Sequence, residues 1–203
     1  MAFLVLPPLL LFGAPGVLLW RLYSLEAPRV PLPPRPPSRP GLWYCSHRAD
    51  VRFPFQHLFI RITPSESAWA VRRPDLFGQS DADGTPYCTL GAGPREGKLF
   101  LEFNRSYDLR DPVSFEEPIP CRDAVEENAR ISALLDAAGA YGQSLEFAAW
   151  SRISGPGYNC NSMIHELAGR AGLPGPDFAR HFLLCPGIGR GLPKTAFREP
   201  ERP

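Results

Sequence analysis

Residues 27–40 restrict the fold of this chain most strongly, because seven of these fourteen positions are proline. Proline has no backbone N–H and a fixed φ, so such a segment cannot lie inside a helix or a central strand. It favours an extended polyproline II spacer, although a ligand for proline-binding modules is an alternative. The segment therefore divides the chain into an N-terminal part (1–23), a linker (24–40) and one folded domain (41–203).

The N-terminal part is apolar. Residues 1–20 carry no charge, and about 20 apolar residues suffice to cross a bilayer as a helix. We therefore expect residues 1–23 to form a transmembrane anchor that holds the protein at a membrane. A cleaved signal peptide and a buried segment are the alternatives, and no Lys or Arg precedes Arg21 to form the basic start of a signal peptide.

The charge of the chain is almost balanced, with 22 basic and 21 acidic residues. Binding to nucleic acid depends on clustered positive charge that neutralises phosphates. The composition therefore predicts no nucleic-acid partner.

The folded domain begins with strand patterns and ends with helix patterns, which predicts an α+β fold. The expected strands are 57–62, 68–73 (as a hairpin with the first) and 98–104, with a loop over 74–97. The expected helices are 123–138, capped by Asp123, and 160–171, stopped by Gly172 and Pro174.

The second expected helix contains the residue most indicative of catalysis, Cys160, in its first turn, and Asn159 precedes it as the N-cap. Free amides and the helix dipole at this position stabilise a thiolate and an oxyanion. His57, on a strand face opposite Leu58, is the candidate base. An inert core cysteine, or one held in a disulfide or by a metal, is the alternative.

A third polar residue that would orient His57 is harder to assign. Glu102 and Asn104 share one face of a predicted strand and are the candidates, with a solvated face as the alternative. The other cysteines are Cys45, Cys88, Cys121 and Cys185, a number that suits two disulfides with Cys160 left as a thiol, in a pairing that the sequence does not give. No Cys or His spacing is typical of zinc, and we expect no metal and no cofactor.

The segment YNCNS before an amphipathic helix resembles the cysteine segment of circularly permuted papain-like hydrolases. The motif is most similar to the PPPDE peptidases, within a group that includes NlpC/P60-like and lecithin:retinol acyltransferase-like proteins. In that group the histidine strand precedes the cysteine helix, as His57 precedes Cys160 here. The resemblance implies a permuted papain-like domain with an antiparallel sheet packed on the cysteine helix, and a role for Tyr158 beside Asn159 in positioning the oxyanion.

The region from His57 onward also resembles an uncharacterised bacterial membrane-associated family with a GPNSNTF segment, which has Ser at the position of Cys160. Together these resemblances imply a membrane-anchored cysteine hydrolase that cleaves an amide bond in a peptide or peptidoglycan-like substrate. They also imply a bacterial inner-membrane protein. The cysteine count suits an oxidising compartment and places the domain in the periplasm, whereas the basic residues that follow the apolar segment, Arg21, Arg29, Arg35 and Arg39, favour the cytoplasm as the alternative. A non-catalytic envelope binding or scaffold domain and a lipid acyltransferase or thioesterase-like enzyme are the alternatives.

Overall fold

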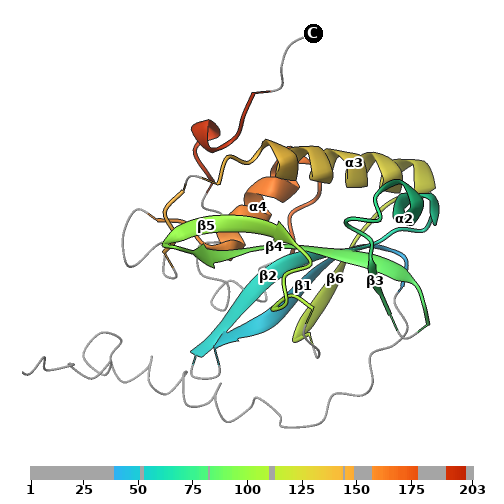
Figure 1. Ribbon diagram of the computed structural model, residues 1–203, viewed down its shortest axis with the longest axis horizontal. Coiled ribbons are helices and arrows are strands. Elements are labelled where there is room, and N and C mark those ends of the chain that lie inside the picture. The colour runs from blue at the N-terminus through green and yellow to red at the C-terminus, as the bar shows by residue number, and fades with distance from the viewer. Residues whose placement is uncertain are drawn as a thin grey trace, which may run out of the picture.

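The structure is a computed structural model, and it describes residues 39–50, 53–81, 83–109, 113–143, 145–148, 157–177 and 191–199. Within these residues the chain forms an antiparallel sheet with helices against it (Figure 1). The α+β class predicted from the order of strand and helix patterns is confirmed. The expected N-terminal anchor (1–23) and nearly all of the linker (24–40) lie outside the described residues.

The sheet has six strands in the order β3-β4-β2-β1-β6, and β5 pairs with β4. Every strand pairing is antiparallel. The strands are β1 (Gly41–Asp50), β2 (Phe53–Thr63), β3 (Gln79–Ser80), β4 (Pro86–Arg95), β5 (Lys98–Phe103) and β6 (Phe115–Ile119).

The hairpin partner of β2 is β1, and the prediction that residues 68–73 pair with it is wrong. In β1 and β2 the Cα atoms of His47 and His57 stand opposite each other. Residues Ala68–Arg72 instead form the one-turn helix α2, in which Trp69 is buried and Val71 is 81% exposed. The alternation of apolar residues in this short segment fits a strand and a helical turn equally well, and the packing of Trp69 on Phe77 selects the helix.

The region 74–97 is not the loop that its glycines and aspartates predict, because it contains β3 and the central strand β4. Leu90 and Ala92 of β4 are fully buried in the hydrophobic core. The alternate residues Gly91 and Gly93 face the other side of the sheet, where the segment after β5 packs directly on the strand. Glycine in a strand interior marks such a close approach, and here it hid the strand pattern.

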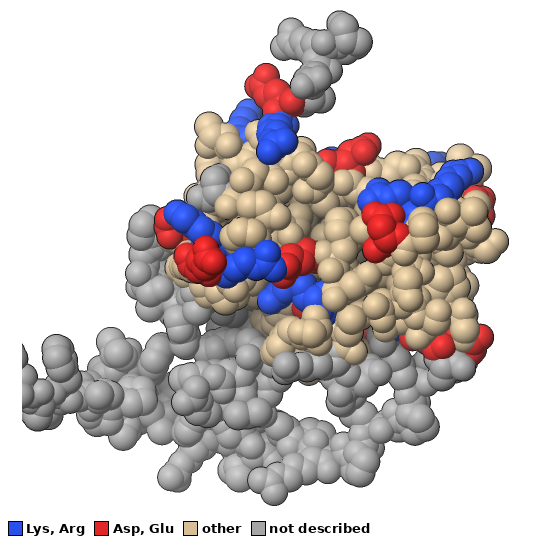
Figure 2. Space-filling model, viewed as in Figure 1, with Lys and Arg blue, Asp and Glu red and all other residues tan. Residues whose placement is uncertain are grey.

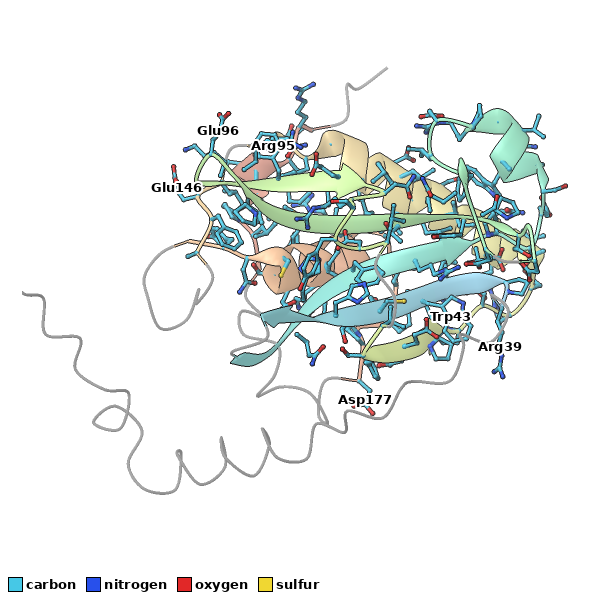
Figure 3. All side chains as sticks on the ribbon, turned by 60° about the horizontal axis from the view of Figure 1, so that its bottom comes forward. Arg39, Trp43, Arg95, Glu96, Glu146 and Asp177 are labelled. Carbon is cyan, nitrogen blue, oxygen red and sulfur yellow. The ribbon has the colours of Figure 1, made fainter. Side chains whose placement is uncertain are left out.

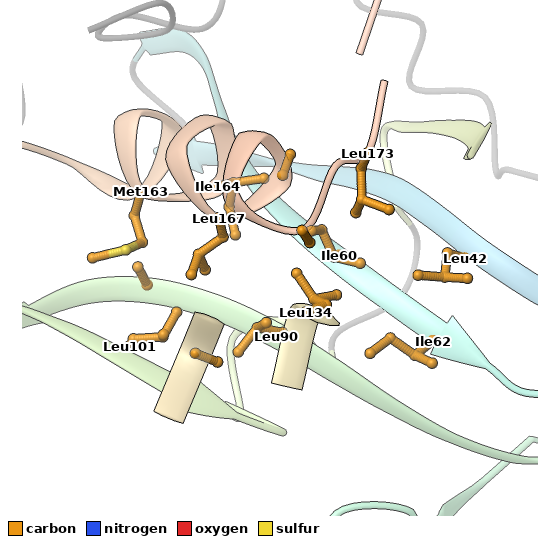
Figure 4. Close-up of a cluster of buried hydrophobic side chains, with 14 of the residues drawn as sticks. Leu42, Ile60, Ile62, Leu90, Leu101, Leu134, Met163, Ile164, Leu167 and Leu173 are labelled. Carbon is orange, nitrogen blue, oxygen red and sulfur yellow. The ribbon is translucent and has the colours of Figure 1, made fainter. Parts of the chain in front are cut away.

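Helices α3 (Ala124–Ala140) and α4 (Cys160–Arg170) begin where the sequence predicts. The Asp123 side chain caps α3 by accepting a hydrogen bond from Glu126 N at 2.8 Å. Both helices lie on one face of the sheet (Figure 1). Figure 4 shows part of the core between these layers, including Leu42, Ile60, Ile62, Leu90, Leu101, Leu134, Met163, Ile164, Leu167 and Leu173.

Charged side chains pair across strand ends at the surface. Arg95 forms an ion pair with Glu102, and Lys98 pairs with Glu146. Figure 3 shows Arg95, Glu96 and Glu146 at the same end of the sheet, and Figure 2 shows basic and acidic groups interspersed over the viewed face. Exposed pairs of this kind contribute about 1 kcal/mol or less each, so the buried core is the main source of stability.

Two expectations about the chain require correction. The prediction of a transmembrane helix is wrong for the part of the chain that the structure describes, where no helix has both the length and the apolar character to cross a membrane. The prediction of two disulfides is also wrong, since it needs all four of the other cysteines and Cys88 and Cys121 are thiols. Cys185 lies outside the described residues.

Candidate active site

His57 lies on the face of β2 that points away from the hydrophobic core, and it is only 6% exposed. Its Nε2 atom is 2.6 Å from Oδ1 of Asp108, whose side chain is fully buried. An ionised carboxylate only accepts hydrogen bonds, so Nε2 carries the proton and donates it to Asp108. The other ring nitrogen, Nδ1, is then the one available to a nucleophile.

Cys160 is the first residue of α4 and is half-buried. Asn159 caps the helix: its side chain accepts from Ser162 N at 3.1 Å, and Ser162 Oγ accepts from Asn159 N at 2.9 Å. The first amides of a helix have no carbonyl acceptor within that helix, so the N–H groups of Cys160 and Asn161 are suited to bind a negatively charged oxygen.

Cys160 lies close enough to His57 to influence its pKa, although the two residues are far apart in the chain. Burial by itself would lower the pKa of His57. The negative charge of the Cys160 thiolate, hydrogen bonds with Asp108 and Cys160, and the charge of Asp108 outweigh it and raise this pKa to about 9. This balance favours the imidazolium form of His57.

Asp108 reaches His57 because β4 has no side chain where the carboxylate packs. A Cβ atom at Gly91 would stand 2.7 Å from Asp108 Cγ, and one at Gly93 would meet the guanidinium of Arg105. Arg105 holds the turn by donating to Ala92 O at 2.6 Å, and its Nη1 lies 3.9 Å from Asp108 Oδ2. Among the described residues Oδ2 accepts no hydrogen bond, so Oδ1 and its bond to His57 anchor the carboxylate.

Aromatic rings surround the imidazole. Tyr107 meets His57 edge-on with ring centroids 5.2 Å apart, and Phe59 stacks on His47 at 4.9 Å. His47 Nε2 lies 3.4 Å from the backbone oxygen of Asp108. These rings keep water from the His57–Asp108 pair, which strengthens its electrostatic interaction.

The Asn161 side chain joins α4 to β2 at the site. Its Oδ1 accepts from Leu58 N at 3.0 Å, and its Nδ2 donates to Gln56 O at 3.1 Å. These two backbone groups flank His57 along the strand. The helix that begins at Cys160 is therefore held against the residue that carries the base.

Glu102 and Asn104 do not orient His57, and this prediction is corrected in favour of Asp108. Glu102 forms ion pairs with Arg95 and with Arg105, the latter at 3.6 Å. Asn104 accepts from Thr89 N at 2.9 Å and donates to Leu76 O at 2.6 Å.

Asn159 and Tyr158, the two residues expected beside the oxyanion, have different surroundings in the structure. Asn159 is 2% exposed, and its side chain serves as the N-cap of α4. Tyr158 packs against the core, and its backbone forms a parallel bridge with Phe147 that leads the chain into α4. We therefore assign Asn159 a structural role in presenting Cys160, and we assign no chemical role to Tyr158.

Sequence reasoning missed Asp108 because it lies in a turn 51 positions beyond His57. The sequence feature that could have indicated Asp108 is the pair of alternating glycines, Gly91 and Gly93. Such a pair indicates that another segment packs on a strand face that carries no side chains. That signal points to the face of the sheet that carries His57, since Gly91 is paired with Phe59.

The remaining histidines have other surroundings. His165 lines a cavity of about 400 Å³ with Glu166 and Arg170, farther along α4 than Cys160, and His181 lies outside the described residues. In the described ranges, no three or more His, Cys, Asp or Glu residues are grouped so as to hold a metal ion. The chain matches no protein-family model, no curated protein and no solved structure in the comparisons made with each.

Proposed function

We propose that this protein is a cysteine hydrolase of the permuted papain-like type, with Cys160 as nucleophile, His57 as base and acid, and Asp108 as the residue that orients His57. The observation that carries the proposal is the buried contact from Asp108 to His57, continued by the interaction of His57 with Cys160 at a helix start. A nucleophile, a base and an orienting carboxylate in this order form a catalytic triad.

The reaction begins with attack of the Cys160 thiolate on the carbonyl carbon of an amide. A C–S bond forms, the carbonyl π electrons move to oxygen, and the N–H groups of Cys160 and Asn161 stabilise the oxyanion. The His57 imidazolium then protonates the leaving nitrogen, the C–N bond breaks, and a thioester remains on Cys160. Neutral His57 next takes a proton from water, whose oxygen attacks the thioester and releases the acid and the thiolate.

Asp108 holds the imidazole in the tautomer that this sequence needs. With Nε2–H donated to the carboxylate, Nδ1 is directed to Cys160, and the negative charge of Asp108 stabilises the imidazolium. The surrounding Tyr107 and Phe59 rings keep this pair desolvated.

The substrate class rests on the resemblance of the YNCNS segment to permuted papain-like hydrolases, and on the order of His57 before Cys160. On this basis we propose an amide in a peptide or peptidoglycan-like chain as substrate. An acyl ester is the corresponding substrate for an acyltransferase with the same nucleophile.

The first test uses p-nitrophenyl acetate, which reports acyl transfer to a nucleophile without requiring the natural substrate. We expect the full-length protein to release nitrophenolate and to gain one acetyl group on Cys160, detected by mass spectrometry of its peptides. Cys160→Ala abolishes both signals, and His57→Ala lowers the rate by about a hundredfold or more. Cys121→Ala is the matched control, since it removes another half-buried thiol and leaves the reaction intact.

Acylation that persists in Cys160→Ala, or that does not occur in the wild type, would refute the proposed nucleophile. Peptide amides and peptidoglycan stem peptides are then compared with acyl esters. Turnover of the amides supports the hydrolase, and turnover confined to esters supports the acyltransferase.

A further inference from the structure

We infer that Asn161 is a positioning residue whose carboxamide sets the separation of the Cys160 thiolate and the His57 imidazole. The inference rests on the proposed function, because it concerns the same nucleophile and base. It assigns Asn161 two contributions: a backbone N–H for the oxyanion and a side chain that holds the two catalytic elements together.

The Asn161 side chain occupies the place beside β2 that a neighbouring strand would take. Asn161 is 1% exposed, and its side chain both donates to β2 and accepts from it, as a neighbouring strand would. The pairing of β4 with β2 extends only to Phe59 opposite Gly91, after which β4 continues along β5. Figure 1 shows β2 and β4 diverging. The carboxamide of Asn161 takes over from β4 at Leu58 N and Gln56 O.

These two bonds bracket the base. Gln56 O and Leu58 N belong to the peptide groups on either side of His57 Cα, so they fix the part of β2 from which the imidazole projects. Asn161 directly follows Cys160, and its Oδ1 also lies 3.5 Å from Cys160 Sγ. A shift of the carboxamide therefore changes the position of the sulfur relative to the ring.

A small shift matters because proton transfer and attack require atoms at hydrogen-bond distance. A misplacement of about 1 Å lowers rates by about a hundredfold in well-ordered sites. Asn161→Ala removes both bonds. Asn161→Asp keeps the shape and still accepts from Leu58 N, but when ionised it repels Gln56 O and places a negative charge beside Sγ.

The experiment measures the rate at which iodoacetamide alkylates Cys160 in the full-length protein, by peptide mass spectrometry, from about pH 5.5 to 9. An unstructured peptide thiol, which ionises near 8.5, is the reference. We expect wild-type Cys160 to react faster than the reference below about pH 7, and each Asn161 variant to lose about tenfold or more of that rate.

Gln143→Ala is the matched control. The Gln143 carboxamide makes the same two bonds to a strand backbone, accepting from Leu101 N at 3.0 Å and donating to Leu101 O at 3.1 Å. Its loss lowers the melting temperature but leaves the alkylation profile unchanged. A merely structural Asn161 would behave in the same way.

A folded Asn161→Ala or Asn161→Asp protein with the wild-type profile overturns the inference and leaves the proposed function intact. Wild-type Cys160 that reacts no faster than the reference peptide overturns the proposed function, and the inference with it. If Asn161→Ala does not fold, the near-isosteric Asn161→Asp decides between these results.

Discussion

Replacing Gly91 by alanine tests whether Asp108 orients His57, without changing any residue of the proposed triad. The new Cβ would stand 2.7 Å from Asp108 Cγ, whereas carbon atoms in contact are normally about 3.5 Å or more apart. The carboxylate must therefore move by about 1 Å. If the whole displacement lies along the 2.6 Å bond from His57 to Oδ1, the bond lengthens to about 3.6 Å and is no longer a hydrogen bond.

The expected loss follows from the energy of that bond. A hydrogen bond to a charged group contributes about 1.5–3 kcal/mol, equivalent to about a 10- to 150-fold change in rate. We expect Gly91→Ala to slow acylation of Cys160 by p-nitrophenyl acetate by this factor, and to lower the pKa of His57 toward its usual value.

The assay compares Gly91→Ala with Asp108→Ala and with the double variant. Because both changes remove the same interaction, the double variant should be no slower than Asp108→Ala alone. Gly139→Ala is the matched control: it lies in the last turn of α3, where an added Cβ would meet no atom within 4 Å apart from the neighbouring residues and the helix backbone, and the change should leave the rate unaffected. A folded Gly91→Ala protein with the wild-type rate would refute the role of Asp108.

Three further outcomes follow from the structure. The pKa of His57 is higher in the folded protein than its ordinary value of about 6.5. Protonated His57 therefore stabilises the fold fully below pH 6.5, and this stabilisation is lost as the pH rises through about 9. His57→Gln should flatten the dependence of melting temperature on pH in that window. Leu134→Ala should reduce the free energy of unfolding by about 2–5 kcal/mol in urea titrations, because Leu134 is fully buried between α3 and the core, and a loss below 1 kcal/mol would contradict that packing. Asn159→Ala should cost about 1 kcal/mol through loss of the N-cap of α4, whereas an unchanged urea midpoint would show that the cap contributes nothing.

The parts of the fold that the sequence predicts correctly are those set by neighbouring residues. The start of α4 follows from Asn159 and Ser162, which bond each other across one helical turn. The start of α3 follows from Asp123, whose side chain accepts a hydrogen bond from Glu126 N. β2 follows from the alternation around Ile60, because one of its faces is buried in the core.

The errors arise where a distant contact decides between local alternatives. Trp69 lies in a segment whose pattern fits either strand or helix, and its bond from Nε1 to Asn128 joins it to α3. The glycines of β4 weaken a strand pattern, and only the turn that carries Asp108 explains why they are there. Local propensity cannot represent contacts of this kind.

The same division applies to the site. Local patterns predict that Cys160 starts a helix and that His57 lies on the non-core face of a strand, because a cap and an alternation are properties of neighbouring residues. The hydrogen bond from His57 to Asp108 and the attachment of the helix to the strand by Asn161 arise from contacts between distant segments. Both depend on where β4 leaves β2, and this is set by the packing of whole elements, which no short stretch of the chain encodes.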